Sequence, residues 1–271
     1  QTPNLVVVGT QSSGKSTTIN NLIGFNLLPT GKSIVTRTPL ILTLLNTTQH
    51  ITNIEITNID NKKYILPDHI TQVQEHIVSL TNQYAGPNKN IVNKPINLLI
   101  TGPNLPNLTI TDLPGLTNIA LTDKGQESDI KNKIKEMINH YISNPRSIIV
   151  SIIPCTIDVE SDMGLGLICK IDPTFSRTIG VLTKPDLLSH DSNMGSYLDL
   201  DNNISSNLRL KYGYYIVNNS SLDYKKDLNI DYYKFLEGER ITSLEFFTNH
   251  PIYKLPRYSS KIGVSNLGRS L

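Results

Sequence analysis

The sequence predicts an α/β fold with a doubly wound, mainly parallel sheet and helices on both faces. Three observations support this prediction. Short apolar runs alternate along the 271 residues with amphipathic segments of helical period. The run 5–8 is apolar at every position, as in a parallel strand buried on both faces, and a glycine follows it. No repeat or linker-like stretch interrupts the alternation, so we expect a single domain over residues 1–271.

The first half of the chain is expected to supply most of the strands. Apolar runs predict strands over 5–8, 38–45, 51–59, 96–101 and 108–111. Helical period predicts helices over 17–24 and 68–84. The segment 51–59 alternates apolar with polar residues, which is typical of a strand near the edge of a sheet.

The second half continues the alternation. Strands are predicted over 147–153, 178–182 and 214–217, and helices over 128–142 and 237–247. In a sheet of this class, ligands bind at the carboxyl ends of the strands. The residues that follow each predicted strand are therefore the candidates for a ligand site.

The composition excludes several classes of protein. Lys and Arg number 25 against 23 Asp and Glu, so a nucleic-acid binder that works by counterion release is not expected. No apolar run approaches a membrane span, and the longest is 148–153. Cys155 and Cys169 are expected to be reduced thiols of a cytoplasmic protein. The chain begins at Gln1 without a signal peptide, and we expect it to be part of a longer protein.

Residues 9–16, GTQSSGKS, fit the pattern G-x-x-x-x-G-K-S/T between a predicted strand and a predicted helix. In that context backbone N–H groups wrap phosphates, and the helix N-terminus adds positive potential. Lys15 would reach the β- and γ-phosphates, and the Ser16 hydroxyl would ligate Mg²⁺. A chance turn rich in glycine and serine is the weaker alternative. The expected nucleotide contacts are Gln11, Ser12, Ser13, Gly14, Lys15, Ser16 and Thr17.

Residues 112–115, DLPG, follow the predicted strand 108–111. Asp112 can hold the water shell of Mg²⁺. The Gly115 N–H can reach a γ-phosphate because no Cβ blocks the approach. Alone, the four residues are typical of any Pro-Gly turn, but the upstream phosphate loop favours the nucleotide interpretation.

Residues 183–186, TKPD, follow the strand 178–182 and indicate which base is bound. The Asp186 carboxylate can accept from guanine N1–H and from the 2-amino group, whereas adenine offers neither donor there. The Lys184 stem can lie along the base, next to Thr183. Asn218, Asn219 and Ser220 follow the strand 214–217 and could close over the base. The four signals together predict a site for GTP or GDP.

The same residues resemble a known family. The segments GTQSSGKS (9–16), IVTRTPL (34–40), DLPGLT (112–117), RTIGVLTKPD (177–186) and the FF-x-x-HP-x-Y pattern (246–253) are similar to those of the dynamin superfamily of large GTPases. The TKPD form looks most like the myxovirus-resistance branch. The resemblance covers nearly the whole chain as a P-loop GTPase domain. It implies that the helical stalk and the membrane-binding part lie outside these residues.

The resemblance also implies how GTP is hydrolysed. Small GTPases place a glutamine two residues after the switch glycine, where this chain has Thr117. Gln11 and Thr36 are instead implied to position the attacking water, and Thr36 to help hold Mg²⁺. A monovalent cation, K⁺ or Na⁺, is implied to supply positive charge in place of an arginine finger.

The cation site and Arg37 complete the implied machinery. Ser12 and the backbone carbonyls of Gly31 and Ser33 match the positions that hold the cation, and the family usually has glycine where Ser33 stands. Arg37 could contact the nucleotide and stabilise charge in the transition state, or form a structural salt bridge.

Self-association through GTPase domains is also implied. Asp158, in the segment 154–162, matches an acidic residue of a loop that crosses the dimer interface, although composition alone favours a solvated turn. The family often has an acidic residue where Ser189 stands, and Arg where Asn219 stands. Contact with membrane lipids, and peripheral membrane association, are expected only through parts outside this chain.

Two other functions are compatible with part of the sequence. A slow GTP-regulated assembly scaffold, in which nucleotide state gates oligomerisation, is the alternative to an enzyme stimulated by dimerisation. Gln11, Lys15, Ser16 and Thr36 favour the enzyme. An ATP-dependent kinase is disfavoured by the TKPD segment.

Overall fold

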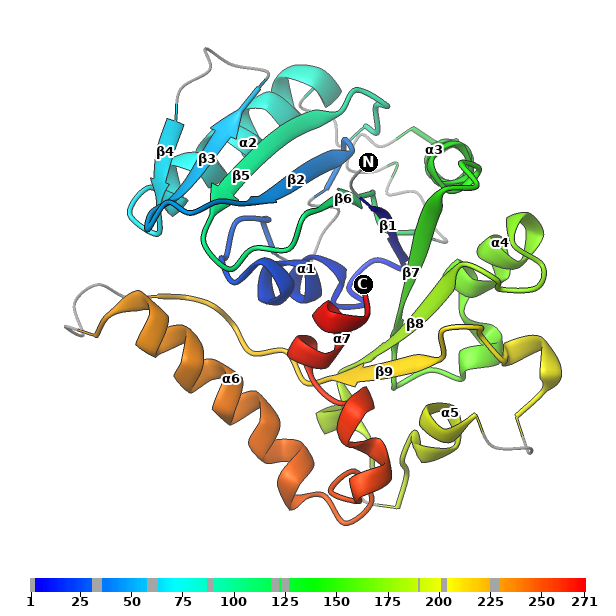
Figure 1. The fold of residues 1–271 in the computed structure, drawn as a ribbon. Coiled ribbons are helices and arrows are strands. Elements are labelled where there is room, and N and C mark those ends of the chain that lie inside the picture. The colour runs from blue at the N-terminus through cyan, green and yellow to red at the C-terminus, as the bar shows by residue number, and fades with distance from the viewer. Residues whose placement is uncertain are drawn as a thin grey trace. The chain divides into compact units, whose positions relative to one another are not determined.

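The computed structural model describes residues 3–30, 36–57, 63–86, 90–117, 122, 127–189, 191–200, 204–224 and 230–271. The chain forms two compact units, each with its own strands and helices (Figure 1). Unit 1 comprises residues 1–12 and 27–149, and unit 2 comprises residues 13–26 and 150–271. The single domain expected from the sequence over residues 1–271 stays a prediction.

Strands and helices alternate as expected (Figure 1). The strands are β1 (Asn4–Gly9), β2 (Leu40–Asn46), β3 (Thr52–Ile56), β4 (Lys63–Leu66), β5 (Ile96–Gly102), β6 (Leu108–Asp112), β7 (Ser147–Pro154), β8 (Thr178–Thr183) and β9 (Tyr214–Val217). The α-helices are α1 (Lys15–Ile23), α2 (Ile70–Ala85), α3 (Ile130–Ile142), α4 (Met163–Ile171), α5 (Gly195–Asp199), α6 (Tyr232–Asn249) and α7 (Val264–Ser270). Short 3₁₀ helices are η2 (Val159–Ser161), η3 (Pro185–Leu187), η4 (Ser206–Leu208) and η6 (Pro256–Lys261).

The predicted strands and helices all occur, with shifted ends. Strand β3 ends at Ile56, and part of the predicted segment 51–59 lies outside the described residues. Helix α6 begins at Tyr232, five residues before the predicted start at 237, because the Asp231 carboxylate accepts from the N–H groups of Tyr233 and Lys234 as an N-cap. None of the described helices is long and apolar enough to cross a bilayer.

The sheet in unit 1 is mixed. Its strands lie in the order β4-β3-β5-β2-β6-β1. The pairs β1–β6 and β2–β5 are parallel, whereas β2–β6, β3–β4 and β3–β5 are antiparallel. Only residues 103–107 separate β5 from β6, which is too short for the crossover that parallel strands need. The two strands therefore run in opposite directions on either side of β2, which explains why the sheet is less parallel than the sequence predicts.

In unit 2, strands β7, β8 and β9 are neighbours in that order, and β8 and β9 are parallel. Every residue of β8 and β9 is buried, as expected for strands with covered faces. Gly180 makes this packing possible, because a Cβ there would lie 2.3 Å from Cδ1 of the fully buried Tyr214. The Tyr214 hydroxyl donates to the Leu208 carbonyl at 2.8 Å, and burial raises its pKa.

A buried carboxylate joins the end of α4 to the start of β8. Asp172 is 4% exposed and accepts hydrogen bonds from the Ser176 N–H and hydroxyl, the Arg177 N–H and the Thr178 hydroxyl. Burial by itself raises the pKa of Asp172, but the hydrogen bonds to the charged form outweigh it, and the pKa is lowered. The ionised carboxylate therefore stabilises the fold.

We expect Asp172→Asn to lower the free energy of unfolding at pH 7 by on the order of 2 kcal/mol, because the hydrogen bonds to a charged acceptor are weakened. A lowered pKa stabilises the fold above the unfolded pKa of about 3.9, and that contribution is lost as the pH falls through the folded pKa. The difference between variant and wild type should thus shrink below about pH 4. Urea unfolding across pH tests this, with Asp191→Asn, at an exposed position, as control. A difference that stays constant with pH would contradict the role of the charge.

Candidate nucleotide site

In unit 1, the loop after β1 is bonded to the loop after β6. The Gln11 N–H donates to the Leu116 carbonyl at 2.9 Å, and the Leu116 N–H donates to the Gly9 carbonyl at 3.0 Å. Gly115 lies so close that a Cβ there would be 2.9 Å from the Cα and N of Gln11. Position 115 therefore requires glycine for backbone packing. This requirement adds to the predicted access of its N–H to a γ-phosphate.

The two side chains assigned to Mg²⁺ in unit 1 are in contact. The Thr36 hydroxyl donates to Oδ2 of Asp112 at 3.2 Å, and the residues are 8% and 0% exposed. A hydroxyl beside a carboxylate is a set of hard oxygen donors that suits Mg²⁺. In the described part of the chain, no group of three or more His, Cys, Asp or Glu side chains is placed to hold a metal ion.

The monovalent cation site has only one member in the described residues. Ser12 is exposed and has a left-handed backbone, with φ of 63°. Such a conformation is uncommon for a residue other than glycine and is often found at functional loops. Gly31 and Ser33 lie outside the described residues.

Arg37 is bound to the end of a helix in unit 1. Its guanidinium donates to the Gly86 carbonyl at 2.7 Å and to the side-chain oxygen of Asn82, at the C-terminus of α2. Burial lowers the pKa of Arg37. These partners are neutral oxygens instead of the carboxylate of a salt bridge, and a cation at this helix end is favoured by the helix dipole.

In unit 2, the remainder of the phosphate loop leads into α1. Gly14 is left-handed, with φ of 93°, and Lys15 begins the helix. The Thr183 hydroxyl at the end of β8 donates to the Ser13 carbonyl at 2.5 Å. The Ser13 hydroxyl is buried and has no hydrogen-bond partner among the described residues, as expected if a ligand supplies one. The main chain of the phosphate loop is thus held by the segment predicted to recognise the base.

The base-recognition segment turns sharply after β8. Lys184 has φ of 57°, and the 3₁₀ helix η3 follows and presents Asp186 on the surface. Cys155, which directly follows β7, donates its N–H to the Thr183 carbonyl at 2.8 Å. Burial and the nearby Asp186 carboxylate raise the pKa of the Cys155 thiol to about 12, so this cysteine is an unreactive neutral thiol.

The loop 218–221 after β9 is fastened to two helices of unit 2. The Asn219 side-chain amide donates to the Thr18 hydroxyl at 2.8 Å, and that of Asn21 donates to the Ser220 carbonyl at 3.1 Å. From α6, the Ser243 hydroxyl donates to the Ser220 hydroxyl at 3.2 Å. Thr18, Asn21 and Ser243 belong to no motif, so sequence reasoning missed them.

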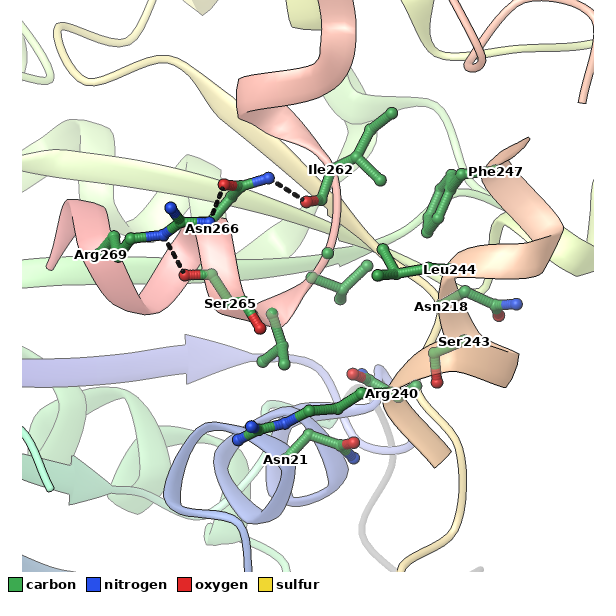
Figure 2. A pocket seen from close by; sticks show the side chains of 14 residues that line it. Asn21, Asn218, Arg240, Ser243, Leu244, Phe247, Ile262, Ser265, Asn266 and Arg269 are labelled. Carbon is green, nitrogen blue, oxygen red and sulfur yellow. Dashed lines mark hydrogen bonds between the residues drawn. The ribbon is translucent and has the colours of Figure 1, made fainter. Parts of the chain in front are cut away.

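A cavity of about 110 Å³ lies beside this loop within unit 2 (Figure 2). Asn21, Asn218 and Asn219 contribute to its wall, together with residues of α6 and α7. Thr183, Lys184 and Asp186 do not line it. The cavity is therefore distinct from the segment predicted to recognise guanine.

Asp158 lies on the surface of unit 2, immediately before η2. Burial raises the pKa of Tyr197, and the negative charges of Glu160 and Asp158 raise it further. An exposed acidic turn of this kind fits both interpretations of Asp158 from the sequence, a dimer interface and a solvated turn.

Comparison with known proteins gives consistent matches. A model of the Dynamin family matches residues 5–185. The chain is 36% identical over 272 residues to Dynamin of Drosophila melanogaster, covering 99% of this chain and 28% of the relative. It is 36% identical over 273 residues to Dynamin-2 of Homo sapiens, covering 99% and 29%, and 36% identical over 295 residues to Dynamin-B of Dictyostelium discoideum, covering 98% and 30%. The chain thus spans less than a third of the length of these relatives.

Proposed function

This chain belongs to the dynamin family and has the expected α/β fold, and we propose that it is the GTPase domain of a dynamin-like protein, which hydrolyses GTP and uses Mg²⁺. The observation that carries the proposed site is how the phosphate loop is held. In unit 1 its Gln11 is bonded to Leu116 of the DLPGLT segment, and in unit 2 its Ser13 is bonded to Thr183 of the TKPD segment. Each contact links the loop to a segment with a separate task in nucleotide binding.

In the proposed site, Lys15 and the backbone N–H groups of residues 12–17 bind the phosphates. Ser16, Thr36 and Asp112 would hold Mg²⁺, which would neutralise charge that develops on the phosphate oxygens. The contact between Thr36 and Asp112 supports this assignment, because both oxygens are already buried at one place. The Gly115 N–H binds the γ-phosphate.

Hydrolysis requires an oriented water and a compensating positive charge. We propose that Gln11 and Thr36 orient the water. Ser12, Gly31 and Ser33 would hold a K⁺ or Na⁺ ion, which would supply the charge. Arg37 is a weaker candidate for contact with the nucleotide, because two of its nitrogens are committed to the end of α2.

Base recognition is assigned to Thr183, Lys184 and Asp186, and closure over the base to Asn218, Asn219 and Ser220. The exposed Asp186 carboxylate supports this role, since it is accessible to a base. In the full-length protein we propose a cytoplasmic location, peripheral contact with membrane lipids, coupling of hydrolysis to membrane remodelling, and no nucleic-acid partner.

We further propose that GTPase domains associate through the loop that carries Asp158 and that association stimulates hydrolysis. Specific activity with Mg²⁺ should then rise several-fold with protein concentration, and it should be higher in K⁺ or Na⁺ than in a bulky organic cation. GDP with aluminium fluoride should promote dimers, because the interface is completed only in the closed state. Steady-state phosphate release and light scattering measure the two effects.

Asp158→Ala should weaken both effects while nucleotide affinity stays within about twofold, because Asp158 is not assigned to the nucleotide. Lys170→Ala, on α4, is a control for removal of an exposed charge. A wild-type chain that stays monomeric with the analogue, with activity independent of concentration, would remove the dimer mechanism. Hydrolysis that stays slow at every concentration while nucleotide still changes the oligomeric state would favour the assembly scaffold.

A further inference from the structure

We propose that Thr18 and Asn219 are positioning residues that form a hydrogen-bond relay from the base-closing loop to the phosphate loop. The relay holds the loop 218–221 in place for a guanine nucleotide and so slows nucleotide release. The inference rests on the proposed function, since it assumes that both loops bind one nucleotide. It assigns a role to Thr18, which the motifs leave without one.

The relay consists of two consecutive hydrogen bonds within unit 2. The side-chain amide of Asn219 donates to Oγ1 of Thr18 at 2.8 Å. The same Thr18 hydroxyl donates its proton to the carbonyl oxygen of Gly14, also at 2.8 Å. Gly14 is the left-handed glycine that precedes Lys15, so the relay ends at the main chain of the phosphate loop.

The hydroxyl of Thr18 suits this role because it donates and accepts at once. A threonine hydroxyl has one proton and two lone pairs. Here the hydroxyl donates to the Gly14 carbonyl and accepts from the Asn219 side-chain amide. Thr18 is 1% exposed, so water cannot readily replace either partner. Hydrogen bonds in such a chain polarise one another, which strengthens the link.

A second contact holds the same loop against α1. Asn21, which is buried, donates its side-chain amide to the Ser220 carbonyl at 3.1 Å and to the Thr17 carbonyl at 3.0 Å. Figure 2 shows Asn21 in the wall of the cavity beside the loop, with Asn218 and Ser243. Asn219 and Ser220 are thus both hydrogen-bonded to α1, the helix that follows the phosphate loop. Movement of the base-closing loop requires these bonds to break.

The chain offers a matched control for the substitution. Thr81 in α2 is 6% exposed, and its hydroxyl donates to the Ile77 carbonyl at 2.7 Å, four residues earlier, as Thr18 does to Gly14. Thr81→Val and Thr18→Val therefore remove the same kind of helix contact at a buried site. Thr18 differs in that its hydroxyl also accepts a hydrogen bond from the Asn219 side-chain amide.

The experiment measures release of fluorescent GDP and the kinetic constants for GTP. Thr18→Val and Asn219→Ala should each release GDP roughly 2- to 10-fold faster, the effect expected of one lost hydrogen bond. For Thr18→Val, KM for GTP should rise by a similar factor with kcat within about twofold, because Thr18 does not touch the reacting atoms. Thr18→Ser, which keeps the hydroxyl, should behave like wild type, and Thr81→Val should leave release unchanged.

The double variant tests the relay itself. Thr18→Val combined with Asn219→Ala should release GDP no faster than the faster of the two single variants, because both remove the bond between Asn219 and Thr18. Additive effects, or equal acceleration by Thr81→Val, would overturn the relay. If Asp186→Asn leaves guanine selectivity intact, the proposed base site is wrong and the relay fails with it. If wild type selects guanine and the relay variants release GDP normally, only the relay is wrong.

Discussion

Asp186→Asn is expected to convert preference for GTP into preference for xanthosine triphosphate. The wild-type carboxylate accepts from two guanine donors, and an amide at that position can accept from only one while it donates a proton of its own. Xanthine presents an acceptor where guanine has its amino group, so the amide pairs with it. The ratio of the two affinities should change by roughly 10⁴-fold, the discrimination found where a site is built to hydrogen-bond its ligand.

Calorimetry with GTP, ATP and xanthosine triphosphate measures this directly. Asp191→Asn is the matched control, because it removes a carboxylate at an exposed position five residues further along the chain. It should leave all three affinities within about twofold, as expected for an exposed charge that is not assigned to the base. Unchanged GTP binding in Asp186→Asn would show that another group reads the base.

Substitutions in the phosphate loop and at Thr36 should separate nucleotide binding from GTP hydrolysis. Lys15→Ala should lose much of the nucleotide affinity, because it removes a charge-assisted contact to phosphate. Gln11→Glu and Thr36→Ala should retain affinity within a few-fold while kcat falls by roughly 10²- to 10³-fold, as when a group that orients or stabilises the transition state is removed. GDP affinity by calorimetry and single-turnover phosphate release distinguish these outcomes.

The contact between Thr36 and Asp112 makes the second experiment sharper. Thr36→Ser keeps the hydroxyl that donates to the Asp112 carboxylate, so it should recover most of the turnover that Thr36→Ala loses. Loss of activity in Thr36→Ser equal to that in Thr36→Ala would show that the methyl group, and hence packing, is what matters. Equal loss of binding in the Lys15, Gln11 and Thr36 variants would remove the division of roles.

Local patterns predicted most of the strands and helices and missed those with weak signals. β4 is only four residues long, and α4 is a mostly apolar segment of nine residues with two glycines, which are poor helix formers. The positions of the antiparallel pairs in unit 1 were not predicted, because periodicity reports which residues are buried and carries no information on strand direction. The order in which β2 lies between β5 and β6 depends on pairing between distant segments.

The sequence by itself determined the chemistry available to this protein. The phosphate loop, DLPG and TKPD each follow a buried strand, and short-range patterns of strand, turn and helix are sufficient to place them there. Tertiary structure decided which groups hold these loops. Thr183 bonds to Ser13 across 170 positions and Asn219 to Thr18 across 201, while Arg37 bonds to neutral oxygens at the end of α2. Such partners are chosen by the fold, because a hydrogen bond depends on positions in space that no local periodicity encodes.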